Sequence, residues 1–302
     1  MRISLFCGVV VASADQAVDR ARSAAADGFG AIWYAQGFAL DALTALAVVA
    51  HEVPDIDLGT AVVPIQGRHP LPLALQALTV SGIAGPGRFS LGLGVTHAVV
   101  SEGCFGIPYR STVALCAEEM AALAGLLGPE RAAQHEGTLL TARGKLGPDA
   151  PSPSLVLAAL GPKMLEIAGR YGDGTVTWMT GPATLERDVV PGLAASAEAA
   201  GRATPRVVVG LPVCVTDDVD GARQRLGVGM AGAAQMPSYR RMLAAEGVAQ
   251  PVDIALVGSE DAVGQRIEAL GRAGATELLA NVQGEPDEQA RTRRYLGTLA
   301  GR

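Results

Sequence analysis

Short apolar runs alternate with longer segments of mixed polarity along the whole chain. The runs are mostly about five residues long and almost continuously hydrophobic, which is typical of strands buried on both faces of a parallel sheet. The segments between them are bounded by residues that start or stop helices. This alternation predicts eight strand–helix units, whose strands are expected at residues 2–11, 31–34, 56–63, 88–94, 155–160, 175–179, 206–215 and 277–282.

Helix boundaries are marked by single residues between these runs. Ser13 is suited to be an N-cap, and Gly28 suits the end of the first helix. Pro54 stops the second helix, because a residue before proline avoids the helical region, and Pro162 suits a helix start. The predicted helices cover residues 13–28, 41–53, 71–84, 111–127, 163–171, 183–200, 260–274 and 287–299.

Eight strand–helix repeats indicate a (β/α)8 TIM barrel of the α/β class rather than a doubly wound sheet. No linker or composition shift divides the chain, so residues 1–302 are expected to form one domain with insertions after strands 4 and 7. The first insertion, residues 132–146, is polar and predicts a hairpin or loop on the barrel rim. The second, residues 219–247, is interrupted by glycines and Pro237 and is too long for one helix.

Composition narrows the class of protein. The 302 residues are 49% hydrophobic and 18% charged, which suits a large core and excludes a disordered chain. The net charge is -6 with Lys and Arg scattered, so neither nucleic acid nor an acidic membrane surface is an expected partner. No apolar run approaches the roughly 20 residues that span a bilayer. An anionic ligand would have to be bound by local groups.

The four cysteines indicate a reducing compartment. Cys7, Cys104, Cys116 and Cys214 show no C-x-x-C spacing and lie in apolar surroundings, so we expect buried free thiols and a cytoplasmic protein. The start of the chain, with Ala12-Ser13-Ala14 after an apolar run, also imitates a secretory signal and its cleavage site. We assign these residues to the first strand and helix instead.

In a barrel of this kind, functional residues lie at the carboxyl ends of the strands. The predicted ends carry no Asp/Glu pair for glycoside hydrolysis, no lysine for Schiff-base chemistry and no cluster spaced as metal ligands, so no metal site is expected. They are apolar, aromatic and rich in glycine instead. Gly94, Thr96 and Gly161 allow close backbone approach or hydroxyl donation to a phosphate. An organic cofactor that carries the chemistry fits these ends best.

A few side chains at these ends have two interpretations. His97 is a candidate proton donor to the substrate, or a hydrogen-bond donor to the cofactor. Gln36 is a candidate hydrogen-bond partner of a ring carbonyl or substrate, or a plain loop amide. Arg68 and His69 either neutralise an anion or orient the third helix. Large apolar side chains wall a substrate pocket or belong to the core, and those considered are Trp33, Trp178 and Met179.

Five sequence runs in order resemble the luciferase-like monooxygenase superfamily, and most closely its coenzyme F420-dependent oxidoreductases. They are LGTAVVP, RHPLPLALQALTV, GRFSLGLGVTH, LAALGPKMLEIAGRYGDG and LVGSEDAVGQRIEALGRAGATELL. The resemblance implies a barrel that binds F420, transfers a hydride to or from a small organic substrate and forms a homodimer. It also implies a non-proline cis peptide at Ala61-Val62, behind the deazaflavin ring. The other implied cofactor-binding residues are Gly94, Val95, Thr96, Ala159, Leu160, Gly161 and Thr177.

The chain departs from this family in three places. Sugar-phosphate dehydrogenases of the family carry a glutamate where this chain has His97, and a phosphate-binding lysine where it has Gly181. The second strand end, WYAQG, lacks the usual acid–histidine pair. A sugar phosphate is therefore not the expected substrate. Two alternatives stay open, namely an FMN-dependent monooxygenase and a barrel that binds a cofactor without catalysis.

Overall fold

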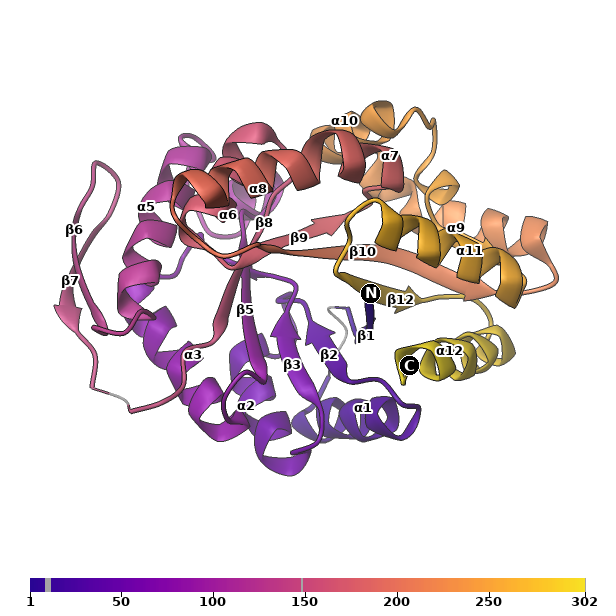
Figure 1. Ribbon diagram of the computed structural model, residues 1–302, viewed down its shortest axis with the longest axis horizontal. Coiled ribbons are helices and arrows are strands. Elements are labelled where there is room, and N and C mark those ends of the chain that lie inside the picture. The colour runs from indigo at the N-terminus through magenta and orange to yellow at the C-terminus, as the bar shows by residue number, and fades with distance from the viewer. Residues whose placement is uncertain (9–11, 148, 302) are drawn as a thin grey trace.

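The computed structural model describes residues 1–8, 12–147 and 149–301, and its centre is a closed barrel of parallel strands (Figure 1). Each strand pairs with the next around a ring, and the ring closes between β9 and β10. The strands around it are β1 (Arg2–Phe6), β2 (Ala31–Tyr34), β3 (Asp57–Thr60), β5 (Phe89–Gly94), β8 (Ser154–Ala158), β9 (Gly174–Trp178), β10 (Arg206–Val215) and β12 (Glu277–Val282). The predicted TIM barrel is confirmed.

Two short strands complete the sheet. After Ala61-Val62 the third strand resumes as β4 (Val63–Pro64), which pairs with β5. The strand β11 (Leu256–Gly258) pairs with β10 outside the ring. The first strand ends at Phe6, earlier than predicted. Cys7 and Gly8 lie outside the strand, and residues 9–11 of that prediction lie outside the described residues.

Helices surround the barrel, and the predicted N-cap at Ser13 is confirmed. The side chains of Ser13, Asp41 and Ser259 each accept a backbone N–H in the first turn of the helix that follows. A π-helical segment, Leu185–Val189, joins α7 to α8, and a short 3-10 turn, Pro251–Asp253, precedes β11. The helices outside the second insertion, apart from the short α4 (Ala98–Gly103), are α1 (Ala14–Ala26), α2 (Ala42–Glu52), α3 (Pro70–Ala84), α5 (Thr112–Leu126), α6 (Pro162–Tyr171), α7 (Pro182–Thr184), α8 (Val190–Ala199), α11 (Glu260–Arg272) and α12 (Pro286–Ala300).

The two insertions differ in part from their prediction. The first is a hairpin of β6 (Ala132–Glu136) and β7 (Thr141–Lys145), but it lies outside the helix layer, against α5 and α3, rather than on the rim (Figure 1). Its turn is held there because the carboxylate of Glu118 on α5 accepts three successive backbone N–H groups at 2.8–3.0 Å. The second splits into α9 (Val219–Ala234) and α10 (Pro237–Glu246). The short helix α4 (Ala98–Gly103) was not predicted.

The cysteines are free thiols, but not all are buried. Cys116 and Cys214 lie in the core, and burial raises the pKa of Cys116 to about 12. Cys7 is half-buried. Cys104 is exposed, because it follows the surface helix α4, so its predicted burial is wrong.

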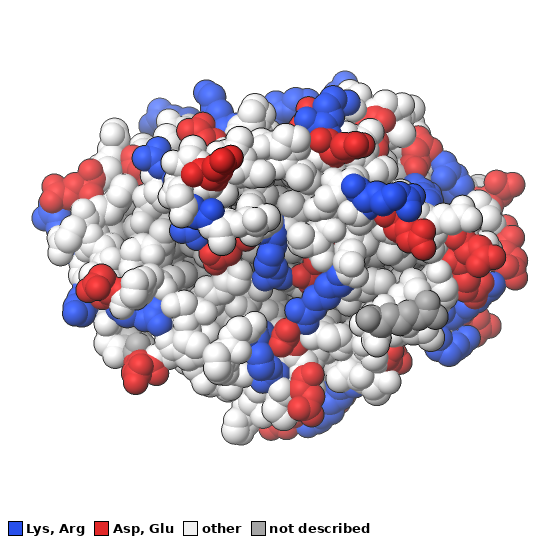
Figure 2. Space-filling view, viewed as in Figure 1, with Lys and Arg blue, Asp and Glu red and all other residues white. Residues whose placement is uncertain are grey.

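Charged side chains of both signs are interspersed on the face shown in Figure 2. In the described part of the chain, no helix combines the length and the apolar character that crossing a bilayer requires.

A packed layer of side chains and a polar network fill the interior of the barrel on the side where the strands begin. Trp33 lies in this layer among small and branched side chains, and Gly59 leaves room for its ring. The buried carboxylate of Glu277 accepts hydrogen bonds from Ser4, from the Trp33 indole at 3.0 Å and from Arg206 at 2.7 Å. The network therefore ties together the first strands and the last strands of the barrel.

Replacing Glu277 by alanine should lower the free energy of unfolding by about 3 kcal/mol, because Arg206 and the Trp33 indole lose their acceptor. Urea denaturation would measure the loss. Glu268→Ala, which removes an exposed ion pair on α11, is the matched control and should cost less than about 0.5 kcal/mol. Equal effects of the two variants would contradict this role for the network.

Candidate functional site

A cavity of about 2290 Å³ opens at the carboxyl ends of the barrel strands. This is the end at which barrels of this kind place their sites. The insertion helix α10 supplies a further wall through Ser238, Tyr239, Arg241 and Met242. At least one lining residue comes from the end of each of six strands or from the loop that follows, namely Phe6, Ala35, Ala61, Val95, Leu160 and Trp178.

The peptide bond Ala61-Val62 is cis, as predicted, and both residues line the cavity. Backbone hydrogen bonds fix the segment to the second strand, since the Ala61 N–H donates to Tyr34 at 2.8 Å and Val62 accepts from Gln36 at 3.2 Å. Behind it lies Gly94, where an added Cβ would come within 2.8 Å of the Val62 side chain. A glycine is needed there because the two segments approach so closely.

The loop after β5 is held by Gln66, which the sequence did not point to. Its side-chain oxygen accepts the backbone N–H of Thr96 at 3.0 Å. The Gln66 side chain is buried and lines the cavity, and its Nε2 has no hydrogen-bond partner among the described residues. Buried polar groups are normally paired, so a donor left over in a cavity wall indicates a ligand acceptor.

Thr177 offers a second unpaired group in the same wall. Thr177 is 1% exposed, and its Oγ1 has no hydrogen-bond partner in the described part of the chain. Leu160 and Gly161 line the neighbouring wall, and Gly161 caps α6, where its carbonyl accepts the N–H of Met164 and of Leu165. Leu160, Gly161 and Thr177, which were predicted to bind the cofactor, thus lie around one space.

His97 lines the cavity at the start of α4 without capping that helix by its side chain. Its ring packs edge-on against Tyr239 of α10, with centroids 5.9 Å apart. Burial lowers the pKa of His97 below its usual value of 6.5. The imidazole is therefore mainly neutral at pH 7, and a neutral ring accepts a proton more readily than it donates one.

Gln36 also lies in the cavity wall, but its amide is engaged within its own loop. Nε2 donates to the Gly37 carbonyl at 2.7 Å, and Oε1 accepts the Ala42 N–H at 2.8 Å. These bonds favour a role in anchoring the loop to the start of α2 over the predicted role in chemistry.

Four predicted residues do not lie in the cavity wall. Trp33 sits lower in the barrel, where its indole faces Glu277. Met179 is 2% exposed and has a positive φ of 57°, with its side chain in the core outside the barrel. Ala159 is fully buried in that core, and Gly94 is covered by Val62. For the two large side chains, the core interpretation is the correct one.

Four cations that line the cavity come from separate parts of the chain. Arg68 is paired with Asp41 at 2.5 Å, whereas His69 caps α3 by accepting the Leu71 N–H. Burial alone would raise the pKa of Asp41, but the hydrogen bond from Arg68 holds this pKa below its usual range. The other three cations are Lys163, Arg187 and Arg241, and nothing in the sequence pattern singled out the last two.

Gly94→Ala should lower the free energy of unfolding by about 1–3 kcal/mol, because the new methyl group meets Val62 and Ala158 in a packed wall. Urea denaturation would test this. Gly161→Ala is the control, since its Cβ would meet open space at an ordinary φ, and it should change stability by less than about 0.5 kcal/mol. A harmless Gly94→Ala would mean that the wall is loosely packed.

Comparison with known proteins agrees with this geometry. The 5,10-methylenetetrahydromethanopterin reductase of Methanolobus tindarius is 29% identical over 206 residues, which are 68% of this chain and 62% of the reductase. The F420-dependent glucose-6-phosphate dehydrogenase of Beutenbergia cavernae is 29% identical over 262 residues, which are 83% of this chain and 72% of that enzyme.

A solved structure and a family profile extend the agreement to the whole barrel. The structure of an F420-dependent secondary alcohol dehydrogenase in complex with an F420-acetone adduct matches with a TM-score of 0.83 at 18% identity, and covers 100% of this chain and 99% of that one. At that identity it supports the fold. The profile of the luciferase-like monooxygenase family matches residues 1–277, and the chain therefore belongs to this family.

Proposed function

We propose that this protein is an F420-dependent oxidoreductase that exchanges a hydride between the deazaflavin and an organic substrate. The observation that carries the proposal is the pair of unpaired buried groups, Gln66 Nε2 and Thr177 Oγ1, in the wall of one large cavity at the strand ends. The F420 dependence of the relatives supports the choice of cofactor.

The residues present fit such a cofactor. A flat heterocycle has apolar faces and polar ring edges, and this cavity combines apolar side chains such as Val62 and Trp178 with a free amide donor and a free hydroxyl. The backbone around Val95, Thr96 and Gly161 would hold the phosphate-bearing chain. No step requires a metal ion.

The volume of the cavity and the positive charges that line it favour F420 over FMN. Most ligand cavities have volumes of about 300–1,000 Å³, and this one is more than twice as large. F420 carries a glutamate tail that FMN lacks, and the cavity is lined by Lys163, Arg187 and Arg241 in addition to Arg68. Among the ion pairs of the described residues, none involves Lys163 or Arg241, so both have their charge available for an anionic tail.

When bound, F420 supplies the acceptor or donor of the hydride. The chain's own residues orient the substrate, keep water away from the reacting carbon and move one proton. The neutral His97 imidazole accepts the proton of a substrate hydroxyl as the hydride leaves its carbon, and returns that proton in the reverse reaction. This refines the sequence prediction, in which His97 acted as a proton donor.

A sugar phosphate fits the site poorly. The helix start at α7, beside Gly181, is occupied by the protein's own carboxylate, because Glu246 accepts the N–H groups of Ala183 and Thr184 and the Thr184 hydroxyl at 2.6 Å. An acidic group at this position repels a phosphate. An uncharged organic substrate agrees better with the cavity. A homodimer and a cytoplasmic location remain predictions.

Cofactor binding tests the proposal directly. Titration of the purified protein with F420 and, separately, with FMN should quench F420 fluorescence at micromolar concentrations and leave FMN fluorescence unchanged. Tight FMN binding without F420 binding would favour the monooxygenase alternative. Binding of F420 without turnover of any secondary alcohol, enone, imine or nitro compound would favour the non-catalytic barrel.

Thr177→Val should have opposite effects on affinity and stability. Loss of the hydroxyl should weaken F420 binding about three- to tenfold, whereas the apoprotein should gain about 1 kcal/mol, because an unpaired buried hydroxyl is removed.

Thr175→Val is the matched control for this change on the same strand. Its hydroxyl donates to the Leu157 carbonyl at 2.8 Å, so this variant should lose stability and keep its F420 affinity. Fluorescence titration and urea denaturation measure the two quantities. A Thr177→Val protein with unchanged affinity would remove this hydroxyl from the cofactor site.

His97→Gln should lower kcat about 100-fold while F420 affinity changes less than twofold, because the proton acceptor is lost and the cofactor contacts stay. In the wild type, alcohol oxidation should be independent of pH between 7 and 8 and fall below pH 6.5, as the imidazole becomes protonated. The residual activity of His97→Gln should not fall in this way below pH 6.5. His51→Gln, at the exposed end of α2, should behave like the wild type.

A further inference from the structure

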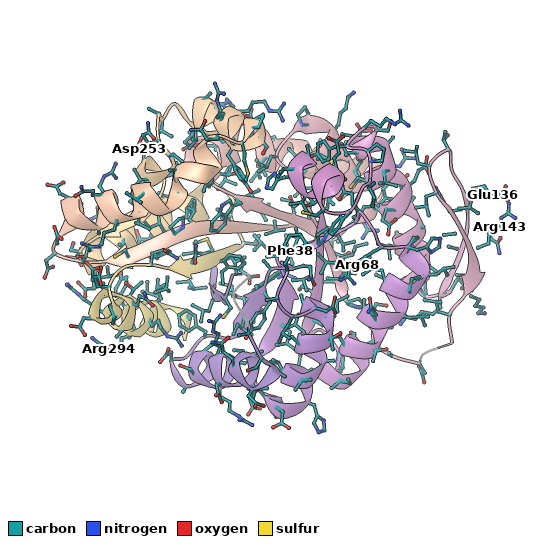
Figure 3. The ribbon with its side chains drawn as sticks, turned by 180° about the vertical axis from the view of Figure 1, so that it is seen from behind. Phe38, Arg68, Glu136, Arg143, Asp253 and Arg294 are labelled. Atoms are coloured by element: carbon teal, nitrogen blue, oxygen red, sulfur yellow. The ribbon has the colours of Figure 1, made fainter. Side chains whose placement is uncertain are left out.

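The mouth of the cavity has an exposed apolar rim, defined here as Phe38, Phe105 and Val113. Phe38, in the loop after β2, is 74% exposed, and Phe105, after α4, is 42% exposed. Their rings lie 6.2 Å apart at 59° although they come from separate loops. Figure 3 shows Phe38 and Arg68 near the middle of this face, away from the hairpin residues Glu136 and Arg143.

Large apolar side chains that water surrounds at a cavity mouth indicate a ligand that covers them. Single exposed apolar residues need no explanation, but these form one group that lines the same cavity. Removing such surface from water is favourable in proportion to its area. A compound with a large apolar body would gain this contribution, and a small polar one would not.

The polar groups beside the rim are already paired. The amide of Gln36 is engaged by its own loop, and the guanidinium of Arg68 by Asp41 and Gln76. Within the described segments 35–38 and 97–113, no residue that lines the cavity is an aspartate, glutamate, lysine or arginine. A charged substrate would lose its hydration here without gaining a partner.

The cations of the cavity lie on other elements. Lys163 belongs to α6, Arg187 to the π-helical segment after α7, and Arg241 to α10. These three cations thus come from elements other than the two segments that carry the rim. The volume of the cavity, about 2290 Å³, leaves room for a second large molecule beside a cofactor.

We infer that the substrate of this site is a bulky, uncharged and largely apolar compound, whose body covers the rim and whose one oxygen-bearing carbon lies toward His97. This inference rests on the proposed function, because His97 and the cofactor act on that carbon. The rim sets the substrate class, and the cations on α6, the π-helical segment and α10 are left to the cofactor.

Nile red, an uncharged polycyclic dye, tests the apolar part of the cavity separately from the chemistry. The F420-loaded protein should bind it with a large rise in dye fluorescence, and 2-decanone should displace it whereas glucose 6-phosphate should not. Phe38→Ser and Phe105→Ser should each weaken dye binding about tenfold. Val228→Ser is the control, since Val228 is 77% exposed on α9 outside the cavity wall, and it should change binding less than twofold.

The outcomes distinguish this inference from the proposed function. Rim variants that bind Nile red as well as the Val228→Ser control would overturn the inference. The inference would also be overturned if sedimentation showed a dimeric wild type and monomeric rim variants while dye binding stayed unchanged. A second copy of the chain would then be what covers the rim. A third outcome is a protein that binds Nile red but not F420, with dye binding lost in the rim variants. That result would support the apolar site and overturn the proposed function.

Discussion

The barrel depends most on the hydrogen bonds that the buried carboxylate of Glu277 accepts. This carboxylate joins Ser4, Trp33 and Arg206, and the guanidinium of Arg206 continues to Ser90 at 3.0 Å and Ser154 at 3.4 Å. These residues lie on β1, β2, β5, β8, β10 and β12, so one polar network connects six of the eight barrel strands. Hydrogen-bonded groups of this kind satisfy the buried charge that would otherwise be costly.

This network and the layer above it allow the opposite end of the barrel to stay open. Trp33 and its neighbours fill the interior beneath the cavity, and two members of this layer, Val176 and Leu279, also line the cavity. The two tryptophans illustrate the division. Trp33 lies inside a strand and belongs to the packed layer, whereas Trp178, the last residue of β9, reaches the cavity.

The parts of the fold that local patterns determine could be predicted from the sequence. Buried parallel strands have a nearly continuous apolar sequence, and an N-cap such as Ser13 acts within one helical turn. The cis bond at Ala61-Val62 and the loop at Thr96 were accessible through resemblance. Which residue at a strand end faces the cavity could not be predicted, because the backbone changes direction where the strand stops. Met179 directly follows β9 with a positive φ, and it lies in the core outside the barrel, as does Ala159 after β8.

Contacts that depend on docking between distant segments could not be predicted either. Tyr239 and Arg241 reach the cavity only because α10 folds back over it, and Glu246 of the same helix is fixed by Thr184. Gln66 was missed because a glutamine in a loop carries no signal until its partner, Thr96, is placed beside it.

The separation of the apolar rim from the Glu277 network has an evolutionary consequence. Phe38 and Phe105 are exposed and contribute little to the packed core, and substitutions at distant, independent sites add without interfering. Descendants of this chain can therefore exchange rim residues one at a time without approaching the threshold of unfolding. Selection is then free to change the range of compounds that the cavity accepts, while the barrel and the walls around the strand ends are inherited intact.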